Sequence, residues 1–359
     1  MSLSIGIVGL PNVGKSTLFN ALTKKSVPAE NYPFCTIDPS VGIVAVPDDR
    51  LDKLAKLSNS AKTIPPAIEF TDIAGLVKGA STGEGLGNKF LSHIREVDAI
   101  AEVVRIFDDK NIVHVAGKLN PLNDVEVINL ELILADLETV SKRQNNLSRE
   151  IKRGDKLALI ENDLLTKIRL VLEAGRLAQT INFTPEELVL VKSLHLLSIK
   201  PILYVFNQKS GEANTDTTLL ESLAKDQGAG FVAVDAKIEQ ELSTLEESDR
   251  SNFKQELAIT DDGLNDLITA SYKLLGLITF FTTGPDETRG WTISAGSKAP
   301  KAGTAIHTDF QDKFIRAEVI GTNDLLRVGS YAKARELGLV RTEGKDYIVQ
   351  DGDVIEFKI

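Results

Sequence analysis

Gly9-Leu-Pro-Asn-Val-Gly14-Lys15-Ser16 is the stretch that decides the fold, because it matches the phosphate-binding pattern GxxxxGK[ST] in full. An apolar, β-branched run from Leu3 to Val8 precedes it, and a helix-like run from Lys15 to Leu22 follows it. Strand, glycine loop and helix in this order open an α/β fold. Further apolar runs alternate with helical patterns, which predicts a mostly parallel sheet with helices on both faces.

Each residue type in this loop suits a triphosphate. The glycines let backbone N–H groups point inward around the β-phosphate, where a side chain would collide. Lys15 would bring positive charge to the β- and γ-phosphates, Ser16 would offer a hydroxyl to Mg²⁺, and the following helix directs its dipole at the anion. We therefore expect the nucleotide to contact Asn12, Val13, Gly14, Lys15, Ser16 and Thr17.

A carboxylate at the end of a buried strand predicts the other side of the metal site. Asp72 ends the run Ile68 to Asp72 and is followed by Gly75, which is the Walker-B arrangement of GTPase-like proteins. Asp72 would hold Mg²⁺ through water, and the Gly75 N–H would sense the γ-phosphate. Thr36 lies in a loop bounded by prolines and would add its hydroxyl to the metal as a switch residue. The expected metal ligands are Ser16, Thr36 and Asp72.

Two positions bear on turnover and on the choice of base. Leu76 follows Gly75 where many GTPases place a glutamine, and a leucine cannot orient the attacking water. His93 and His114 are the histidines near enough in sequence to replace it. After the expected strand Pro201 to Phe206, the guanine-reading pattern Asn-Lys-x-Asp is replaced by Asn207-Gln208-Lys209-Ser210. Without the aspartate, guanine loses its bidentate acceptor, so ATP is expected and GTP is the second candidate.

The rest of the chain predicts an arm and a second domain. From Glu126 to about Ser198 the pattern is helical, with Leu130, Ile133, Leu134, Leu137 and Val140 at helical steps. A break at Arg153-Gly154-Asp155, with Asp155 as N-cap, predicts two long antiparallel helices with basic residues at their tip. From residue 277 a period-two pattern predicts a small β-rich domain. The expected domains are 1–276, interrupted by a helical insert at 125–198, and 277–359.

Composition narrows the function classes. With 359 residues, two or three domains are expected. The single cysteine excludes an intramolecular disulfide framework, and the net charge of −10 argues against broad attraction to nucleic acid. No stretch approaches the roughly 18 to 20 apolar residues that span a bilayer. These features predict a cytoplasmic protein with no membrane contact.

The chain resembles the YchF/Obg-like ATPase family, a branch of the P-loop GTPase class. The resemblance runs along nearly all of the sequence and is carried by many collinear motifs, namely Gly9 to Ser16, Asn31 to Thr36, Asp72 to Leu76, Gly83 to Leu91, His93 to Asp98, Asn120 to Asn129, Phe280 to Gly284, Trp291 to Ile293, Ile306 to Phe310 and Asp346 to Asp353.

The resemblance implies a GTPase-like core, an inserted coiled-coil arm and a C-terminal TGS domain. It also implies ATP preferred over GTP, Mg²⁺ dependence, and association with the ribosome (the large subunit or the 70S particle), with rRNA or tRNA contacts through the arm and the TGS domain. The family's catalytic histidine falls on His114, and its base contacts fall on Asn207 and Gln208. Asn12 occupies the position at which related hydrolases use an asparagine to help hold a monovalent cation, so K⁺ is also expected.

One departure from the family affects the base, because the family reads Asn-x-x-Glu where this chain has Ser210. Two other functions therefore stay open at this point. One is a GTPase of ribosome assembly. The other is a non-catalytic, nucleotide-gated adaptor for RNA or protein, which Leu76 favours.

Overall fold

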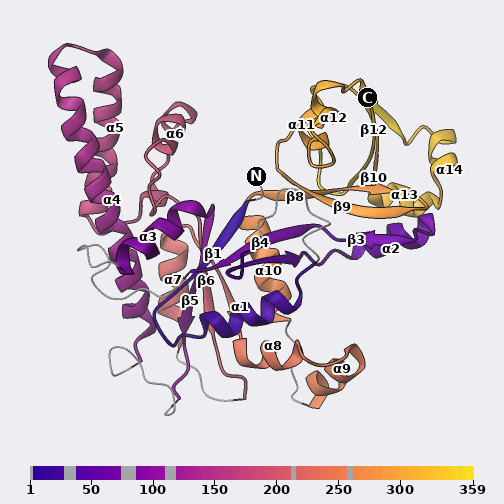
Figure 1. Ribbon diagram of the computed structural model, residues 1–359, viewed down its shortest axis with the longest axis horizontal. Coiled ribbons are helices and arrows are strands. Elements are labelled where there is room, and N and C mark those ends of the chain that lie inside the picture. Colours follow the sequence, from indigo (N-terminus) through magenta and orange to yellow (C-terminus); the bar gives the residue numbers. More distant parts are fainter. Residues whose placement is uncertain (1–2, 28–37, 74–85, 110–118, 212–215, 257–261) are drawn as a thin grey trace.

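Two six-stranded sheets organise the computed structural model of the chain (Figure 1). The structure describes residues 3–27, 38–73, 86–109, 119–211, 216–256 and 262–359. Among these residues, no helix combines the length and apolar character needed to cross a bilayer.

The first sheet has the strand order β2-β4-β1-β5-β6-β7. All neighbours are parallel except β2, which runs antiparallel to β4. Its central strands are buried along their whole length, as expected for a sheet that is covered on both faces. The carboxyl ends of the parallel strands therefore meet at one edge. The strands are β1 (Ser4–Val8), β2 (Val41–Ala45), β4 (Ala67–Asp72), β5 (Ala99–Arg105), β6 (Ile202–Asn207) and β7 (Gly230–Val234).

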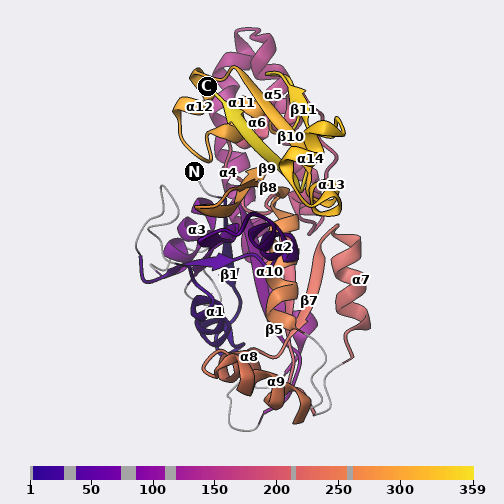
Figure 2. The ribbon, with the colours of Figure 1, turned by 90° about the vertical axis from the view of Figure 1, so that its right-hand side faces the viewer.

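Helices cover both faces of this sheet (Figure 2). On one face lie α1 (Lys15–Lys24) and α10 (Gly263–Leu274), which are joined by a 2.7 Å hydrogen bond from Lys25 Nζ to Asn265 Oδ1. The opposite face is covered by α4 (Pro121–Lys152) and α7 (Thr218–Asp226). The remaining helices of this body are α3 (Leu86–Glu96), α8 (Ala236–Leu242) and α9 (Glu247–Glu256). The predicted α/β architecture is confirmed.

The helical arm consists of the outer part of α4 and of α5 (Lys156–Glu173), which pack against each other (Figure 1). Asp155 caps α5 as predicted, because its Oδ1 accepts hydrogen bonds from the N–H groups of Leu157 (2.8 Å) and Ala158 (3.3 Å). The short helices η3 (Ala178–Thr180) and α6 (Pro185–Lys192) follow.

The first long helix begins earlier than Glu126, where the helical pattern was predicted to start. It begins at Pro121, and Asn120 caps it by accepting the N–H of Asn123. Of the residues that lie at helical steps, Ile133 and Val140 are buried, whereas Leu130 and Leu134 are 51% and 40% exposed. The buried apolar residues of this helix include Val125, Ile128, Leu132, Ile133, Ala135, Val140 and Leu147.

The second sheet has the strand order β11-β10-β12-β8-β9-β3. Four short helices accompany it that the period-two pattern did not predict: α11 (Ala299–Gly303), α12 (Asp309–Asp312), α13 (Thr322–Val328) and α14 (Tyr331–Glu336). At the end of the chain, β12 begins only at Asp353, because a turn at Gly352 (φ 84°) precedes it. The strands are β3 (Lys62–Ile64), β8 (Leu277–Thr283), β9 (Glu287–Ser294), β10 (Arg316–Gly321), β11 (Arg341–Glu343) and β12 (Asp353–Lys358).

The second sheet takes in a strand from the N-terminal part of the chain. Between β2 and β4 the chain leaves the first sheet, forms α2 (Asp49–Ser58), and adds β3 in parallel to β9. Leu51 and Leu54 of α2 are buried in one cluster with Phe281 and Ile320. The C-terminal body is thus completed by residues from α2 and β3.

We predict that Leu54→Ala destabilises the C-terminal body by about 2 to 5 kcal/mol, because a fully buried leucine leaves a cavity when it is truncated. Amide hydrogen exchange of β12 measures this effect. Leu219→Ala on α7, where the leucine is 70% exposed, is the control and should leave the exchange unchanged. Equal exchange of β12 in the Leu54 variant and the parent chain would contradict the packing described.

Candidate nucleotide site

The loop between β1 and α1 adopts backbone angles that glycine makes accessible. Gly9 and Gly14 have φ values of 154° and 102°, and Asn12 between them is left-handed at 64°. A Cβ on Gly9 would lie 2.6 Å from the carbonyl oxygen of Val103, so a side chain there would push the loop off β5. The glycines therefore let the loop lie close to β5 and turn directly into α1.

Lys15 is the buried charge of this loop. Its Nζ donates to the carbonyl oxygens of Gly9 (3.0 Å) and Leu10 (2.7 Å), so the side chain lies along the loop that it follows. Burial lowers the pKa of the Lys15 ammonium to about 8, and the nearby Asp72 carboxylate opposes this shift. Burial likewise raises the pKa of Asp72, while Lys15 opposes the rise. The ammonium and the carboxylate therefore lie close enough to influence each other at the end of β1 and β4.

The residues present fit a magnesium ion. Ser16 is exposed at the first turn of α1, and half-buried Asp72 ends β4 beside Ile7. Mg²⁺ in nucleotide sites takes one or two carboxylates or hydroxyls, and completes its shell with waters and phosphate oxygens. No group of three or more His, Cys, Asp or Glu that could hold a metal occurs among the described residues. At this edge of the first sheet, the described residues thus offer Mg²⁺ one hydroxyl, from Ser16, and one carboxylate, from Asp72.

Asn207 connects the loop to the neighbouring strands. It is buried at the end of β6, where its Nδ2 donates to the carbonyl oxygen of Val13 (2.8 Å). Its Oδ1 accepts the N–H of Ala236 at the start of α8 (3.1 Å). One carboxamide thus holds the phosphate loop and the turn after β7 together.

The expected base-reading residues lie at the same edge. Gln208 follows β6 and donates its backbone N–H to the carbonyl oxygen of Val234 (3.0 Å). The backbone N–H of Ser210 donates to Oδ2 of Asp235, 2.8 Å away. Asp235 and Ala236 were not predicted from the sequence. The signal that could have found them is their position directly after β7, since the carboxyl end of each parallel strand reaches this edge.

Some predicted residues lie outside the described part of the chain. These are Thr36, Gly75, Leu76 and His114. Of the two candidate histidines, His93 is described, and it is exposed on α3. Val13 is buried, whereas Asn12, Ser16 and the half-buried Thr17 reach the surface of the loop. The structure therefore brings together the phosphate loop, Asp72, Asn207 and Gln208 at one sheet edge.

A strand, a phosphate loop with a buried lysine, a facing aspartate and an asparagine-anchored loop define a P-loop protein of the GTPase class. A profile described as a 50S ribosome-binding GTPase matches residues 4–136. A second profile, YchF-GTPase_C, described as a protein of unknown function, matches residues 277–359.

The chain belongs to the YchF family. It is 55% identical over 363 residues to "Ribosome-binding ATPase YchF" of Bacillus subtilis, covering 100% of this chain and 99% of that protein. The Escherichia coli O157:H7 protein of the same name is 47% identical, with 99% of each covered. The structure of the Schizosaccharomyces pombe YchF GTPase matches with a TM-score of 0.89 at 37% identity, covering 99% of this chain and 98% of that one.

We predict that Gly14→Ala abolishes nucleotide binding. The added Cβ would lie 2.3 Å from Asn207 Nδ2, so the carboxamide that anchors the loop must move. Gly154→Ala is the matched control, because Gly154 is also left-handed (φ 78°) but has nothing within 4 Å of the added carbon. Titration with a fluorescent ATP analogue measures the effect. Tight binding by the Gly14 variant would show that the Asn207 anchor is dispensable.

Proposed function

We propose that this chain binds and hydrolyses ATP with Mg²⁺ and uses its nucleotide state to control docking on the ribosome. The observation that carries the nucleotide part is the buried Lys15, whose Nζ is hydrogen-bonded to its own loop carbonyls and whose lowered pKa is opposed by the Asp72 carboxylate. A buried ammonium folded onto carbonyl oxygens is available to exchange these partners for phosphate oxygens. The absence of an acid at Ser210 supports adenine over guanine.

Each residue has a proposed role in this reaction. Lys15 and the loop N–H groups from Asn12 to Thr17 hold the phosphates. Ser16, Thr36 and Asp72 would hold Mg²⁺, which when bound neutralises charge on the β- and γ-phosphate oxygens. Gly75 senses the γ-phosphate. His114 orients the attacking water in place of the glutamine that Leu76 replaces, Asn207 and Gln208 line the base, and Asn12 helps to hold K⁺.

The ribosome part is supported by the relatives and by the arm. The bacterial relatives are named ribosome-binding ATPases. At the arm tip, Arg149, Lys152, Arg153 and Lys156 are exposed, and none of the four has an ion-pair partner in the described part of the chain. In a chain of net charge −10, such a local group of cations suits the phosphates of rRNA or tRNA.

We assign each proposed domain its own role. Residues 1–276 bind the nucleotide, the insert at 125–198 and the TGS domain at 277–359 contact the large subunit or the 70S particle, and the protein is cytoplasmic. A GTPase of ribosome assembly and a non-catalytic adaptor are the alternatives. GTP that displaces ATP with tenfold higher affinity would favour the first, and absence of turnover with ribosomes present would favour the second.

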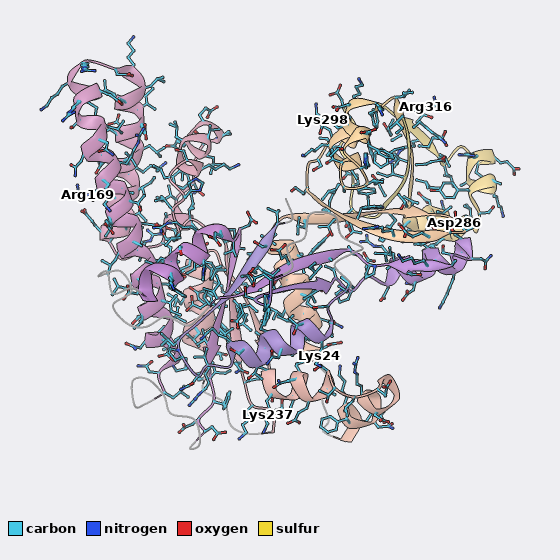
Figure 3. All side chains as sticks on the ribbon, in the orientation of Figure 1. Lys24, Arg169, Lys237, Asp286, Lys298 and Arg316 are labelled. Atoms are coloured by element: carbon cyan, nitrogen blue, oxygen red, sulfur yellow. The ribbon has the colours of Figure 1, made fainter. Side chains whose placement is uncertain are left out.

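We predict that Lys15→Ala lowers ATP affinity by roughly ten- to hundredfold and abolishes turnover, because charge-assisted hydrogen bonds to phosphate are lost. Lys24→Ala is the matched control, since Lys24 lies at the other end of the same helix and is exposed (Figure 3). Calorimetry with ATP and Mg²⁺, and phosphate release, measure both properties. Unchanged affinity and turnover in the Lys15 variant would overturn the nucleotide site.

We predict that Arg153→Glu with Lys156→Glu weakens ribosome binding and makes the slope of log affinity against log salt shallower by roughly 1 to 2, because each lost phosphate contact releases fewer counterions. Cosedimentation at several salt concentrations measures this slope. Lys24→Glu with Lys225→Glu, two exposed lysines of the nucleotide-binding body, is the control. An equal slope in both double variants would remove the arm tip from the interface.

A further inference from the structure

The turn after β6 has no carboxylate of its own at the position where guanine-specific proteins place one, because that residue is the exposed Ser210. The structure places a carboxylate beside this residue from the next strand. Oδ2 of Asp235, the residue after β7, accepts the backbone N–H of Ser210 at 2.8 Å. A carboxylate thus lies beside Ser210, but it comes from the turn after β7, 25 residues further along the chain.

Asp235 does more than cap its own helix. Its Oδ1 caps α8 by accepting the N–H of Ile238 at 3.0 Å, while Oδ2 reaches across to Ser210. At the start of α5, by contrast, Asp155 accepts hydrogen bonds from two N–H groups in the first turn of its own helix. The half-buried carboxylate of Asp235 is therefore fixed between the two turns that frame the base site.

The hydrogen-bonding groups at this edge suit one purine better than the other. Four backbone N–H groups here, those of Gln208, Ser210, Ala236 and Ile238, already have acceptors. Each carboxylate oxygen of Asp235 has two lone pairs, and the hydrogen bonds from Ser210 and Ile238 use one on each oxygen. At position 6, adenine carries an amino donor, whereas guanine carries a carbonyl acceptor. At position 6, a carboxylate accepts from the adenine amino group and repels the guanine carbonyl, and the four N–H groups above are already bonded and not free to donate to that carbonyl.

We propose that Asp235 is a specificity-determining residue that accepts a hydrogen bond from the 6-amino group of adenine. The proposal rests on the proposed preference for ATP and names the group that produces it. Since the carboxylate comes from the turn after β7, the Asn-x-x-Ser sequence after β6 is compatible with selection of adenine.

The test removes each partner of the proposed hydrogen bond in turn, the Asp235 carboxylate from the protein and the 6-amino group from the base. Dissociation constants are measured for ATP, purine riboside triphosphate (hydrogen at position 6) and GTP, with Mg²⁺, on the full chain and on Asp235→Ser. Serine keeps an oxygen for capping α8. In the parent chain, removal of the 6-amino group should weaken binding by roughly tenfold or more, as for a hydrogen bond to a charged acceptor. In Asp235→Ser, ATP should bind as weakly as the purine analogue does, and the purine analogue should bind as it does to the parent.

Asp235→Asn provides a second variant of the same shape, whose amide can donate to a carbonyl at position 6, so the ratio of ATP to GTP affinity should fall. Asp155→Ser, at the arm cap, is the matched control and should leave all three affinities unchanged. If Asp235→Ser weakens ATP and the purine analogue by the same factor, Asp235 only supports the fold of the turn, and the proposal is overturned while the preference for ATP stands.

A parent chain that prefers GTP would overturn both the proposal and the proposed function. A parent chain that prefers ATP but binds the purine analogue equally well would overturn only the role of Asp235. The two failures are therefore distinguishable in one set of titrations.

Discussion

The Asn207 carboxamide is the interaction on which the nucleotide site depends. It is buried at the end of β6, donates to Val13 in the phosphate loop and accepts from Ala236 at the start of α8. A buried amide satisfied on both sides fixes distances between the segments that it joins, because breaking either bond leaves a polar group without a partner. The phosphate loop and the turns after β6 and β7 are thereby held in one arrangement, and Gly14 must stay without a side chain so that the amide can reach the loop.

Much of the fold could be predicted because the signals were local. The loop from Gly9 to Ser16 specifies its flanking strand and helix, and Asp155 specifies the start of α5. The buried face of α4 could not be predicted in the same way. A long helix that packs first against a sheet and then against another helix changes its buried stripe along its length, so Leu130 and Leu134 fit a single helical period but lie exposed.

Site residues could be predicted where the chemistry requires one residue type within a local motif. Residues that reach the site only through the pairing of distant strands could not. Lys15 and Asp72 could be named from the sequence, and the structure brings them close to each other. Asp235 could not, because no pattern within its own segment reports that it lies beside Ser210. That contact arises from the parallel pairing of β6 with β7, which places the two turns side by side. The roles of Thr36, Gly75 and His114 fall outside the described residues and stay predictions.

The path of the chain through α2 and β3 has a consequence for how such proteins can be recombined. A segment that starts at residue 277 carries every strand of the second sheet except β3. It lacks Leu51 and Leu54 of α2, which are buried against Phe281 and Ile320. Exchange of that segment between relatives therefore creates a hybrid seam, with β9 from one parent against β3 from the other. A chimeric protein keeps this packing only if residues 49–64 and the C-terminal segment come from the same parent. Two stretches far apart in the sequence therefore form one structural unit.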